Sequence, residues 1–422
     1  MEYRKRIADQ LLQYRLEETG AVLVEGPKWC GKTTTSSRAA RSIVYMDDPS
    51  LSSQYRELLT LDPTLLLKGD HPRLFDEWQI EPRLWDAIRH YIDRSNKEGL
   101  FILTGSAVPP STDEIHHSGA GRYSWLTMST MSLWESGESI GEISLKGLFA
   151  GESMWGTNHL NLQQMAYIVC RGGWPASLSR NERASLRLVY DYYDAVVKSD
   201  VMRVDNTARN PSLCRDILRA YARIQGSQTA DTVILEDISG GDEPRVSINT
   251  LRSYLDAFEK IFVIRDMKAW NPNLRSKTAV RTSPTRYFSD PSIAVAALGI
   301  GPSDLINDLE TFGFIFETAA VRDLRVYAEP LDGEVYHYRD KNGLECDAVV
   351  HLRNGSYGLV EIKLGGDKAI EHGATTLKAL RNKIDTDRMK EPAFMMVLTA
   401  VGPYAYRRKD GVWVVPLGCL KD

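Results

Sequence analysis

The segment Gly26-Pro27-Lys28-Trp29-Cys30-Gly31-Lys32-Thr33 matches the pattern GxxxxGK[ST] at every fixed position. Backbone N–H groups of such a glycine-rich loop can surround a phosphate, and the dipole of the helix that follows it favours an anion. A lysine at this position reaches the β- and γ-phosphates of a nucleotide, and the next hydroxyl binds Mg²⁺. The sequence therefore predicts a nucleotide site made by Gly26, Pro27, Lys28, Trp29, Cys30, Gly31, Lys32, Thr33 and Thr34.

Short apolar runs on either side of this loop predict the sheet that carries it. Each run is bounded by Gly, Asp or Pro, as is typical of central parallel strands whose two faces are both covered. A helix is expected over residues 34–40, directly after the loop, and strands that alternate with helices indicate an α/β sheet. The expected strands are Ala21–Val24, Ser42–Met46, Arg73–Phe75 and Leu100–Leu103.

Two adjacent carboxylates follow the third of these strands. Asp76 is expected to hold Mg²⁺, and Glu77 to orient or activate the attacking water. A glutamate directly after the aspartate favours ATP hydrolysis over a kinase-like reaction. The strand at Ile43–Met46 lies between the two motifs in the chain, which suits a sheet with one strand inserted between the loop strand and the Mg²⁺ strand.

Further polar residues complete the predicted site. The strand that ends in Leu103 is followed by Thr104 and Ser106, and either hydroxyl could sense the γ-phosphate; the alternative is a polar cap on the next turn. Arg122 follows a loop rich in Ser, His and Gly. It is a candidate arginine finger or sensor, acting in cis or from a neighbouring chain, with a solvated surface arginine as the alternative.

The composition excludes several classes of protein. With 43% hydrophobic and 26% charged residues in a 422-residue chain, wholesale disorder, a collagen-like repeat and a multi-span membrane protein are all ruled out. The net charge of −4 confines any nucleic-acid site to a local basic patch. Scattered cysteines and an N-terminus that lacks a signal-peptide pattern favour the reducing cytoplasm. The cysteines are Cys30, Cys170, Cys214, Cys346 and Cys419.

The middle of the chain is predicted to be helical. Long amphipathic helices are expected over Leu186–Val197 and Ser212–Ile224, and the helix from Ser247 to Phe258 looks like the recognition helix of a winged helix-turn-helix. A strand at Ile261–Ile264, returning near Tyr287 and Phe288, would form the wing. Basic residues of this stretch could contact DNA phosphates, the alternative being solvated loops on a nucleotide-sensing lid. They are Arg265, Lys268, Arg275, Lys277, Arg281 and Arg286, against one acid, Asp266.

The C-terminal third places carboxylates and a lysine on two predicted neighbouring strands. Asp347, with Glu345, lies on one strand, and Glu361-Ile362-Lys363 lies on the next. If the even-numbered apolar residues share a buried face, cross-strand partners sum to an even number, and Glu345, Asp347, Glu361 and Lys363 lie together on the opposite face. This pattern resembles the D…ExK core of the PD-(D/E)xK nuclease fold. In that fold Asp347 and Glu361 would bind Mg²⁺ while Lys363 steadies a phosphate oxygen or positions a water, with Glu317 as a further acid. The alternative is a hairpin with an ordinary charged outer face.

The order of motifs resembles a known family. GPKWCGKTT, LFDEWQ, LTGSA, a GR pair and Gly172-Gly173-Trp174-Pro175 are similar to those of prokaryotic AAA-superfamily ATP-binding proteins, whose C-terminal region is catalogued as domain of unknown function 4143. The resemblance extends over about residues 15 to 405. It implies an AAA-type ATPase core of the STAND/ORC-like branch with a winged helix behind it. The GGWP segment is a hallmark of the family, and its role does not follow from the sequence.

We therefore expect an α/β P-loop ATPase core of the AAA/ASCE type over residues 1–165, a helical and winged-helix region over 166–300, and a restriction-endonuclease-like α/β domain over 301–422. The main hypothesis is an ATP-hydrolysing enzyme that uses ATP and Mg²⁺ and is coupled to DNA binding or processing. The alternatives are an ATP-gated regulator with an inactive nuclease-like domain, and a small-molecule kinase. DNA and a protein are both open as partners, no membrane is expected, and the oligomeric state is open.

Overall fold

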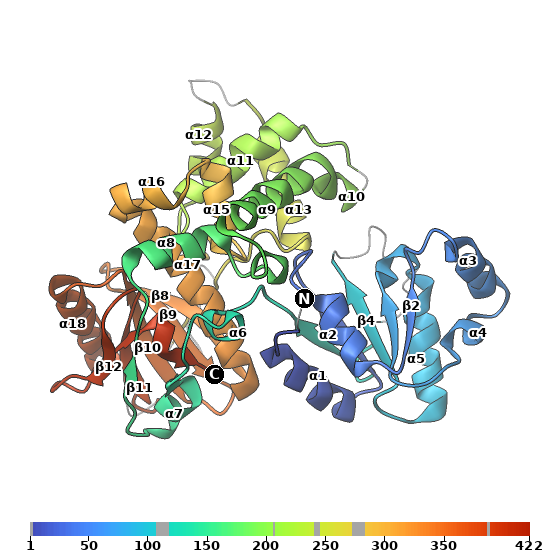
Figure 1. The fold of residues 1–422 in the computed structure, drawn as a ribbon, viewed down its shortest axis with the longest axis horizontal. Coiled ribbons are helices and arrows are strands. Elements are labelled where there is room, and N and C mark those ends of the chain that lie inside the picture. The colour runs from blue at the N-terminus through green and yellow to red at the C-terminus, as the bar shows by residue number, and fades with distance from the viewer. Residues whose placement is uncertain (1–2, 107–117, 206, 240–244, 272–282, 386–388) are drawn as a thin grey trace. The chain divides into compact units, whose positions relative to one another are not determined.

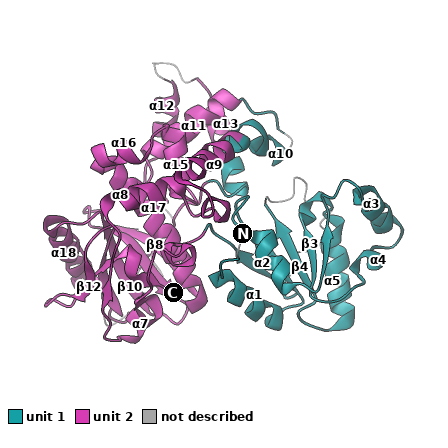
Figure 2. Ribbon diagram, in the orientation of Figure 1, with its two compact units in different colours: residues 1–130, 195–210, 254–263 teal, residues 131–194, 211–253, 264–422 magenta. Residues whose placement is uncertain are grey.

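The computed structural model describes residues 3–106, 118–205, 207–239, 245–271, 283–385 and 389–422. It divides into two compact units, each assembled from separate stretches of the chain (Figure 2). Unit 1 consists of residues 1–130, 195–210 and 254–263, and unit 2 consists of residues 131–194, 211–253 and 264–422. The chain therefore leaves the first unit and returns to it twice.

A parallel sheet forms the centre of unit 1, in the order β2-β3-β4-β1-β5 (Figure 1). The predicted strands are confirmed, and β5 is added beside β1. The strands are β1 (Ala21–Glu25), β2 (Ser42–Tyr45), β3 (Arg73–Asp76), β4 (Phe101–Gly105) and β5 (Tyr123–Thr127). The helices of the first 130 residues are α1 (Ile7–Glu18), α2 (Lys32–Ala39), α3 (Ser52–Leu61), α4 (Pro63–Leu67) and α5 (Arg83–Ser95).

The strand inserted between the loop strand and the Asp76 strand is β4, which corrects the expectation for Ile43–Met46. Val24 pairs with Thr104, and Thr104 pairs in turn with Asp76, whereas β2 lies beyond β3 at the edge of the sheet. The exposure pattern agrees, since Ile43 and Tyr45 are exposed whereas β4 is buried throughout. Nearness in the sequence misleads here because a crossover connection lets a later strand enter the centre of a parallel sheet.

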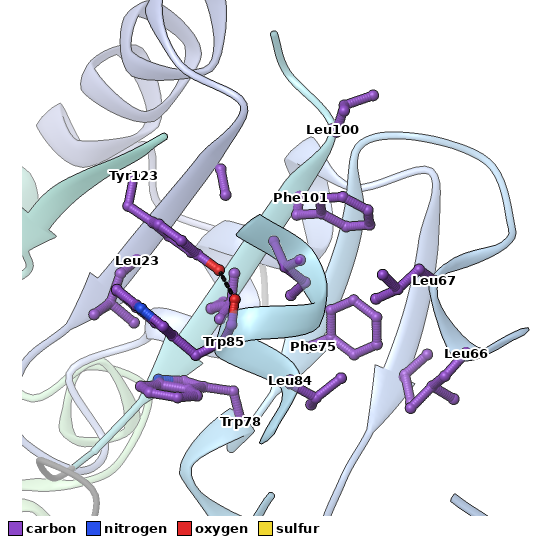
Figure 3. Close-up of a cluster of buried hydrophobic side chains, with 14 of the residues drawn as sticks. Leu23, Leu66, Leu67, Phe75, Trp78, Leu84, Trp85, Leu100, Phe101 and Tyr123 are labelled. Atoms are coloured by element: carbon purple, nitrogen blue, oxygen red, sulfur yellow. Dashed lines mark hydrogen bonds between the residues drawn. The ribbon is translucent and has the colours of Figure 1, made fainter. Parts of the chain in front are cut away.

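Apolar side chains cover both faces of this sheet. On one face, Phe75 and Phe101 pack with Leu84 and Trp85 of α5, and the indole of Trp85 stacks on the ring of Tyr123 with centroids 3.8 Å apart (Figure 3). On the other face, α1 contributes Ala8, Leu12 and Leu16 to a cluster with Val22, Val24, Leu74 and Ile102. Because both faces are buried, the strands have the continuous apolar sequences from which they were predicted.

The predicted helix over Leu186–Val197 ends differently from the expectation. Helix α9 (Glu182–Ala195) continues into a π-helical turn, Val196–Asp200, and then into α10 (Val201–Arg203). This turn and α10 belong to unit 1. π-helical turns inside helices are frequently found at functional sites.

Unit 2 begins with short elements and a group of helices. The short elements are α6 (Leu133–Ser136), β6 (Ile143–Ser144), α7 (Leu145–Ala150) and β7 (Gly156–Thr157). The helices are α8 (Leu162–Arg171), α9, α11 (Pro211–Arg223), α12 (Asp231–Ser239), α13 (Ile248–Lys260, shared with unit 1), α15 (Pro291–Leu298), α16 (Pro302–Asn307) and α17 (Leu309–Ala328). None of the described helices combines the length and the apolar character needed to cross a bilayer.

The C-terminal sheet of unit 2 has the order β7-β12-β13-β11-β10-β9-β8, and α18 (Asp367–Lys383) and α17 lie on its two sides (Figure 1). β8, β9 and β10 form an antiparallel meander, and β11 then pairs parallel to β10 after the α18 crossover. The two strands that the sequence predicts around Asp347 and Glu361 are confirmed as β9 (Glu345–Leu352) and β10 (Tyr357–Lys363). The other strands of this region are β8 (Gly333–Arg339), β11 (Phe394–Thr399), β12 (Tyr404–Arg407), β13 (Trp413–Pro416) and β14 (Leu420–Lys421).

Candidate functional site

The glycine-rich loop turns from β1 into α2 as the pattern requires. Gly26 has φ 147°, and a Cβ on it would lie 2.1 Å from the carbonyl oxygen of Met128, so no other residue fits. Gly31, at φ 105°, forms the N-cap of α2. The Lys32 side chain is buried, and its ammonium donates to the carbonyl oxygens of Gly26 and Pro27, each at 2.9 Å. The Lys32 ammonium therefore points into the loop.

Asp76, at the end of β3, contacts the start of α2 and the end of β4. The Thr33 hydroxyl donates to Asp76 Oδ1 at 2.8 Å, and the buried hydroxyl of Thr104 donates to the same oxygen. A threonine hydroxyl beside a carboxylate oxygen is the hard oxygen set that Mg²⁺ prefers. The residues present therefore fit a nucleotide-bound Mg²⁺ held by Thr33 and Asp76.

Glu77 has a strained backbone and a fixed side chain. Its φ of 56° and ψ of 43° lie in the left-handed region, which is uncommon for a glutamate. The Gln79 amide donates to Glu77 Oε2, and the Ser106 hydroxyl donates to the same oxygen at 3.2 Å. Thr104 and Ser106, both named from the sequence as phosphate sensors, thus contact Asp76 and Glu77 respectively.

The remaining loop residues have different surroundings. Lys28 pairs with Asp200 of the π-helical turn at 2.6 Å, Trp29 is half exposed at φ 65°, and Thr34 is exposed on α2. Cys30 is buried, and its carbonyl oxygen accepts a hydrogen bond at 2.8 Å from Arg6. Sequence reasoning missed Arg6, Gln79 and Asp200, because nothing in their spacing indicates that Arg6 and Asp200 reach the loop or that Gln79 reaches Glu77.

Arg122 lies at the wrong end of the sheet for a role in cis. It precedes β5, and its carbonyl oxygen accepts from the N–H of Ala21 at the start of β1, whereas the loop follows the end of β1. Five strand residues separate the two ends, which is about 16 Å at 3.3 Å per residue. Its side chain donates to Asp93 at 2.7 Å. The in-cis expectation is therefore wrong, and a role towards a neighbouring chain stays a prediction.

The predicted convergence of Asp347, Glu361 and Lys363 is confirmed. β9 and β10 pair in the even-sum register, with Gly358 opposite Val350. The Lys363 ammonium lies 2.9 Å from Asp347 Oδ2 and 2.8 Å from Glu361 Oε2. The face that carries them is not an outer face, since Gly373 of α18 packs over it and Glu361 is only 3% exposed.

Burial strongly perturbs these groups. Burial and the nearby Asp347 raise the pKa of Glu361, and likewise that of Glu317 on α17, to about 8. Burial would lower the pKa of Lys363, but Asp347 and Glu361 together raise it above its ordinary value. The Tyr287 hydroxyl donates to Glu317, so Tyr287 adds a contact that the sequence did not indicate.

Glu345, which the sequence predicts to lie with these residues, does not join them; it forms an exposed ion pair with Arg339 at 3.0 Å instead. Among the described residues, no group of three or more His, Cys, Asp or Glu side chains is arranged to hold a metal. Asp347 and Glu361 nevertheless supply two carboxylates around one point, at present occupied by the ammonium of Lys363. We call Glu317, Asp347, Glu361 and Lys363 the acid–lysine cluster.

The described residues do not form the first strand of the predicted wing. Residues 261–263 form the turn after α13, with Phe262 at φ 58°, so the strand expected at Ile261–Ile264 is wrong. Pairing with the returning segment is limited to isolated bridges, Ile264 with Phe288 and Met267 with Thr285. A residue in the left-handed conformation directly after a helix, here Phe262, terminates the helix, so the extended segment begins only after this turn.

The basic residues of this stretch have different surroundings. Arg286 is an internal ion-pair partner of Asp231 at 2.6 Å and of Asp266 at 2.9 Å, which corrects its expected role in phosphate contact. Lys268 is exposed, and Arg265 is partly buried. Arg275, Lys277 and Arg281 lie outside the described residues.

The GGWP segment has a structural role in unit 2. A Cβ on Gly172, whose φ is 70°, would lie 2.3 Å from Asp290 Oδ1, and one on Gly173 would lie 2.2 Å from the carbonyl oxygen of Met131. Trp174 is fully buried, and its indole N–H donates to Ser292 at 2.9 Å. Only glycines permit this close approach of the chain.

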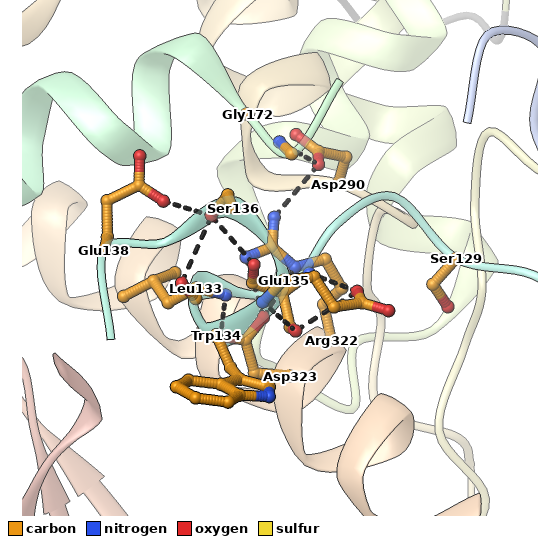
Figure 4. A network of polar contacts seen from close by, with 12 residues as sticks. Ser129, Leu133, Trp134, Glu135, Ser136, Glu138, Gly172, Asp290, Arg322 and Asp323 are labelled. Atoms are coloured by element: carbon orange, nitrogen blue, oxygen red, sulfur yellow. Dashed lines mark hydrogen bonds and ion pairs between the residues drawn. The ribbon is translucent and has the colours of Figure 1, made fainter. Parts of the chain in front are cut away.

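A buried ion network lies against this turn (Figure 4). Arg322 of α17 pairs with Asp290 at 3.1 Å and with Asp323 at 2.7 Å. The Gly173 N–H donates to Asp290 Oδ2, the oxygen that also contacts Arg322, and the Leu133 N–H donates to Asp323 Oδ2, each at 2.9 Å. The network therefore joins four stretches of unit 2 that are distant in the sequence.

Family models match three successive parts of the chain. A model described as an AAA domain matches residues 18–136, domain of unknown function 8612 matches residues 162–304, and domain of unknown function 4143 matches residues 312–420. This chain is an AAA-superfamily protein with a C-terminal domain of unknown function 4143. The P-loop of the AAA-superfamily protein lies within the first match, and the acid–lysine cluster lies within the third.

Curated relatives of this AAA-superfamily protein include two uncharacterized proteins, one from Mycobacterium bovis and one from Mycobacterium tuberculosis. Each is 25% identical over 366 residues, which cover 86% of this chain and 74% of the relative. Among solved structures, the Walker-type ATPase of Pyrococcus abyssi is similar at 14% identity and a TM-score of 0.43, over 68% of this chain and 94% of that one.

Proposed function

We propose that this AAA-superfamily protein binds ATP with Mg²⁺ at the P-loop and hydrolyses it to ADP and phosphate. The observation that carries the proposal is the arrangement at the ends of β3 and β4. Thr33 and Thr104 converge on Asp76, and the adjacent Glu77 is fixed by Gln79 and Ser106. This arrangement supports a role for one carboxylate towards the metal and for a second one, on a separately fixed side chain, towards a water.

Each residue then has one task in the reaction. Loop N–H groups and the Lys32 ammonium bind the β- and γ-phosphates and offset the charge that develops on them. Thr33 and Asp76 hold Mg²⁺, which when bound supplies Lewis-acid polarisation of the phosphoryl oxygens. Glu77 orients the attacking water and accepts its proton, and Ser106 and Gln79 hold the carboxylate in the orientation for doing so.

Phosphate release by the full chain, with ATP and Mg²⁺, tests the proposal. Lys32→Ala is expected to abolish nucleotide binding, and Glu77→Gln to keep binding but to slow hydrolysis on the order of 100-fold. Glu98→Gln, in the exposed turn before β4, serves as the matched control. Wild-type turnover by Glu77→Gln would contradict the role of Glu77, and a phosphorylated small molecule in place of free phosphate would favour the kinase alternative.

A second candidate function concerns the acid–lysine cluster. We propose that it binds a divalent metal and cleaves a phosphodiester in DNA, as the PD-(D/E)xK resemblance implies. Its support is the convergence of two carboxylates on one lysine, with Glu361 buried and Asp347 partly buried; ionisable groups perturbed in this way are found at functional sites. The alternative is an inactive cluster that persists as a structural ion pair, in a protein that only binds.

A plasmid-nicking assay in Mg²⁺ and in Mn²⁺, with and without ATP, decides between these two alternatives. Asp347→Ala and Lys363→Ala are each expected to abolish nicking, and Glu345→Ala, which removes an acid outside the cluster, is expected to retain it. Nicking that survives the first two substitutions would come from a contaminant. No nicking under any condition would leave the binding-only alternative.

We also propose DNA contact through the basic stretch from Arg265 to Arg286. Arg286 does not take part, and the exposed side of α13 adds little charge, because Arg252 pairs with Asp231 and Lys260 with Asp256. Charge reversal at Arg275 and Lys277 should weaken duplex binding for every sequence and flatten the salt slope by roughly one unit per lost contact. Affinity that does not respond to these changes or to salt would leave a lid or a protein-binding module.

A further inference from the structure

The connection that follows Lys363 leads directly into a helix without a side-chain cap. β10 ends at Lys363, and α18 begins at Asp367 with Gly366, at φ 89°, as its N-cap. Glycine has no side chain with which to accept from the first-turn N–H groups. A Cβ on Gly366 would meet nothing within 4 Å, so the space before this helix end is open.

α18 starts on the face of the sheet that carries the acid–lysine cluster. A Cβ on Gly373 would lie 3.3 Å from Glu361 Cβ and 3.2 Å from Val397, so this part of the helix packs directly over β10 and β11. Because β10 leads into α18 within a few residues, the helix runs back over the sheet from the carboxyl ends of the strands. Its first turn therefore lies near Lys363, two residues beyond Glu361.

Thr399 occupies the matching position on the next strand. It is the Cα partner of Lys363 in the parallel β10–β11 pair, and it lies two residues beyond Val397, so its side chain leaves the same face. The residue is 0% exposed, and its hydroxyl has no partner among the described residues. Burying a hydroxyl without a partner is unfavourable, which calls for a ligand that satisfies it.

We propose that the α18 N-terminus, Lys363 and Thr399 form an anion subsite that binds a phosphate group of a phosphodiester substrate. N–H groups at a helix start, a lysine and a hydroxyl are the donors with which proteins hold phosphate. The inference rests on the proposed phosphodiester chemistry of the acid–lysine cluster and names the ligand of that site.

The charges around the subsite make phosphate binding depend on a divalent cation. The carboxylates of Asp347 and Glu361 repel an anion. They also form ion pairs with the Lys363 ammonium, the cation that would otherwise bind the phosphate. A divalent metal between the two carboxylates offsets their charge and frees Lys363 for the phosphate. Phosphate and metal should therefore bind cooperatively.

The test measures binding of radiolabelled inorganic phosphate by equilibrium dialysis, with and without Mn²⁺. Every protein carries Lys32→Ala in the full chain, so that the P-loop does not contribute. Thr399→Val keeps the shape of the side chain and removes the hydroxyl; it is expected to weaken Mn²⁺-dependent phosphate binding about tenfold. Thr399→Ser should restore binding, and Thr375→Val, on the exposed side of α18, should leave it unchanged.

Thermal unfolding distinguishes a ligand-binding hydroxyl from a structural one. Because Thr399→Val removes an unpartnered buried hydroxyl, it should raise the Tm of the phosphate-free protein while it weakens phosphate binding. A lower Tm, or phosphate binding equal to that of the parent, would overturn the subsite. Phosphate binding that needs Thr399 in a protein that nicks no DNA would refute cleavage but keep the subsite. Nicking that Thr399→Val leaves unchanged would keep cleavage and refute the subsite.

Discussion

Glu77 combines a strained backbone with a side chain fixed for chemistry. A non-glycine residue in the left-handed region costs roughly 1–2 kcal/mol, and such strain persists where the surrounding contacts impose it. Here Gln79 and Ser106 hold the carboxylate, and Asp76 directly precedes it in β3. The strain therefore places the carboxylate where a water beside the γ-phosphate would need it.

This strain predicts a gain of stability upon loss of function. Asparagine tolerates the left-handed conformation better than glutamate, so Glu77→Asn should stabilise unit 1 by roughly 0.5–1 kcal/mol and abolish ATP hydrolysis. Glu77→Gln is the matched control, because it removes the carboxylate and keeps the strain. The midpoint of urea unfolding followed by tryptophan fluorescence gives the comparison; an Asn variant no more stable than the Gln variant would contradict the strain account.

At the scale of elements, β8 is attached to the segment that follows α13. Ala269 bridges to His337 in a parallel sense, and backbone hydrogen bonds run in both directions between Lys268–Trp270 and His337. His337 is buried, and the Gln228 amide contacts its Nδ1 at 2.9 Å. The stretch expected to form a free wing thus lies along the edge of the C-terminal sheet.

Burial lowers the pKa of His337 to about 4, which predicts loss of stability in acid. An unfolded histidine titrates near pH 6.5, so below that pH the unfolded chain binds a proton that the folded chain excludes. The contribution of His337 to the free energy of unfolding is present in full above pH 6.5. It decreases as the pH falls towards 4, by about 3 kcal/mol in total.

Urea unfolding between pH 4 and 7 tests this element. His337→Gln should reduce the decrease in the free energy of unfolding between pH 7 and pH 4. His372→Gln, on the exposed side of α18, should leave this pH dependence unchanged. An equal acid loss in the wild type and His337→Gln would show that other groups cause it.

At the scale of the whole molecule, the nucleotide unit is not one continuous stretch of chain. Residues 195–210 and 254–263 belong with residues 1–130, and Asp200 of the returning segment pairs with Lys28 in the loop itself. Arg209 is buried near the ring of Tyr254, with its guanidinium 5.6 Å from the ring centroid, so the two returning segments also contact each other. Nucleotide binding at the loop should therefore stabilise residues that are distant in the sequence, such as 195–205.

Hydrogen exchange of the full chain with ATP and Mg²⁺ measures this coupling. At a nucleotide concentration about 100 times Kd, binding adds roughly 2.7 kcal/mol to the stability of the state that binds. Slower exchange is expected at residues 21–36 and also at residues 195–205, and Lys32→Ala should abolish both effects. Protection of the loop without any change at residues 195–205 would show that the Lys28–Asp200 pair does not couple them.

Features carried by neighbouring residues could be predicted from the sequence. The loop spacing from Gly26 to Thr33, the Asp76-Glu77 pair at a strand end and the alternation around Asp347 and Glu361 each depend on a few consecutive positions. Strand periodicity then determines which side chains share a face. That is why the sequence alone predicts the strands and the convergence of Asp347, Glu361 and Lys363.

Contacts between distant residues were decided by the tertiary structure alone. The insertion of β4 beside β1, the end of the sheet at which Arg122 lies, the Lys28–Asp200 pair and the ion pairs of Arg286 all join positions between which the sequence shows no regular spacing. The same holds for the GGWP turn, whose glycines and tryptophan have a role only beside Asp290 and Ser292. Local spacing constrains torsion angles and faces, whereas burial brings distant chain segments together to satisfy one another's charges and hydrogen bonds, and only the folded chain shows which segments those are.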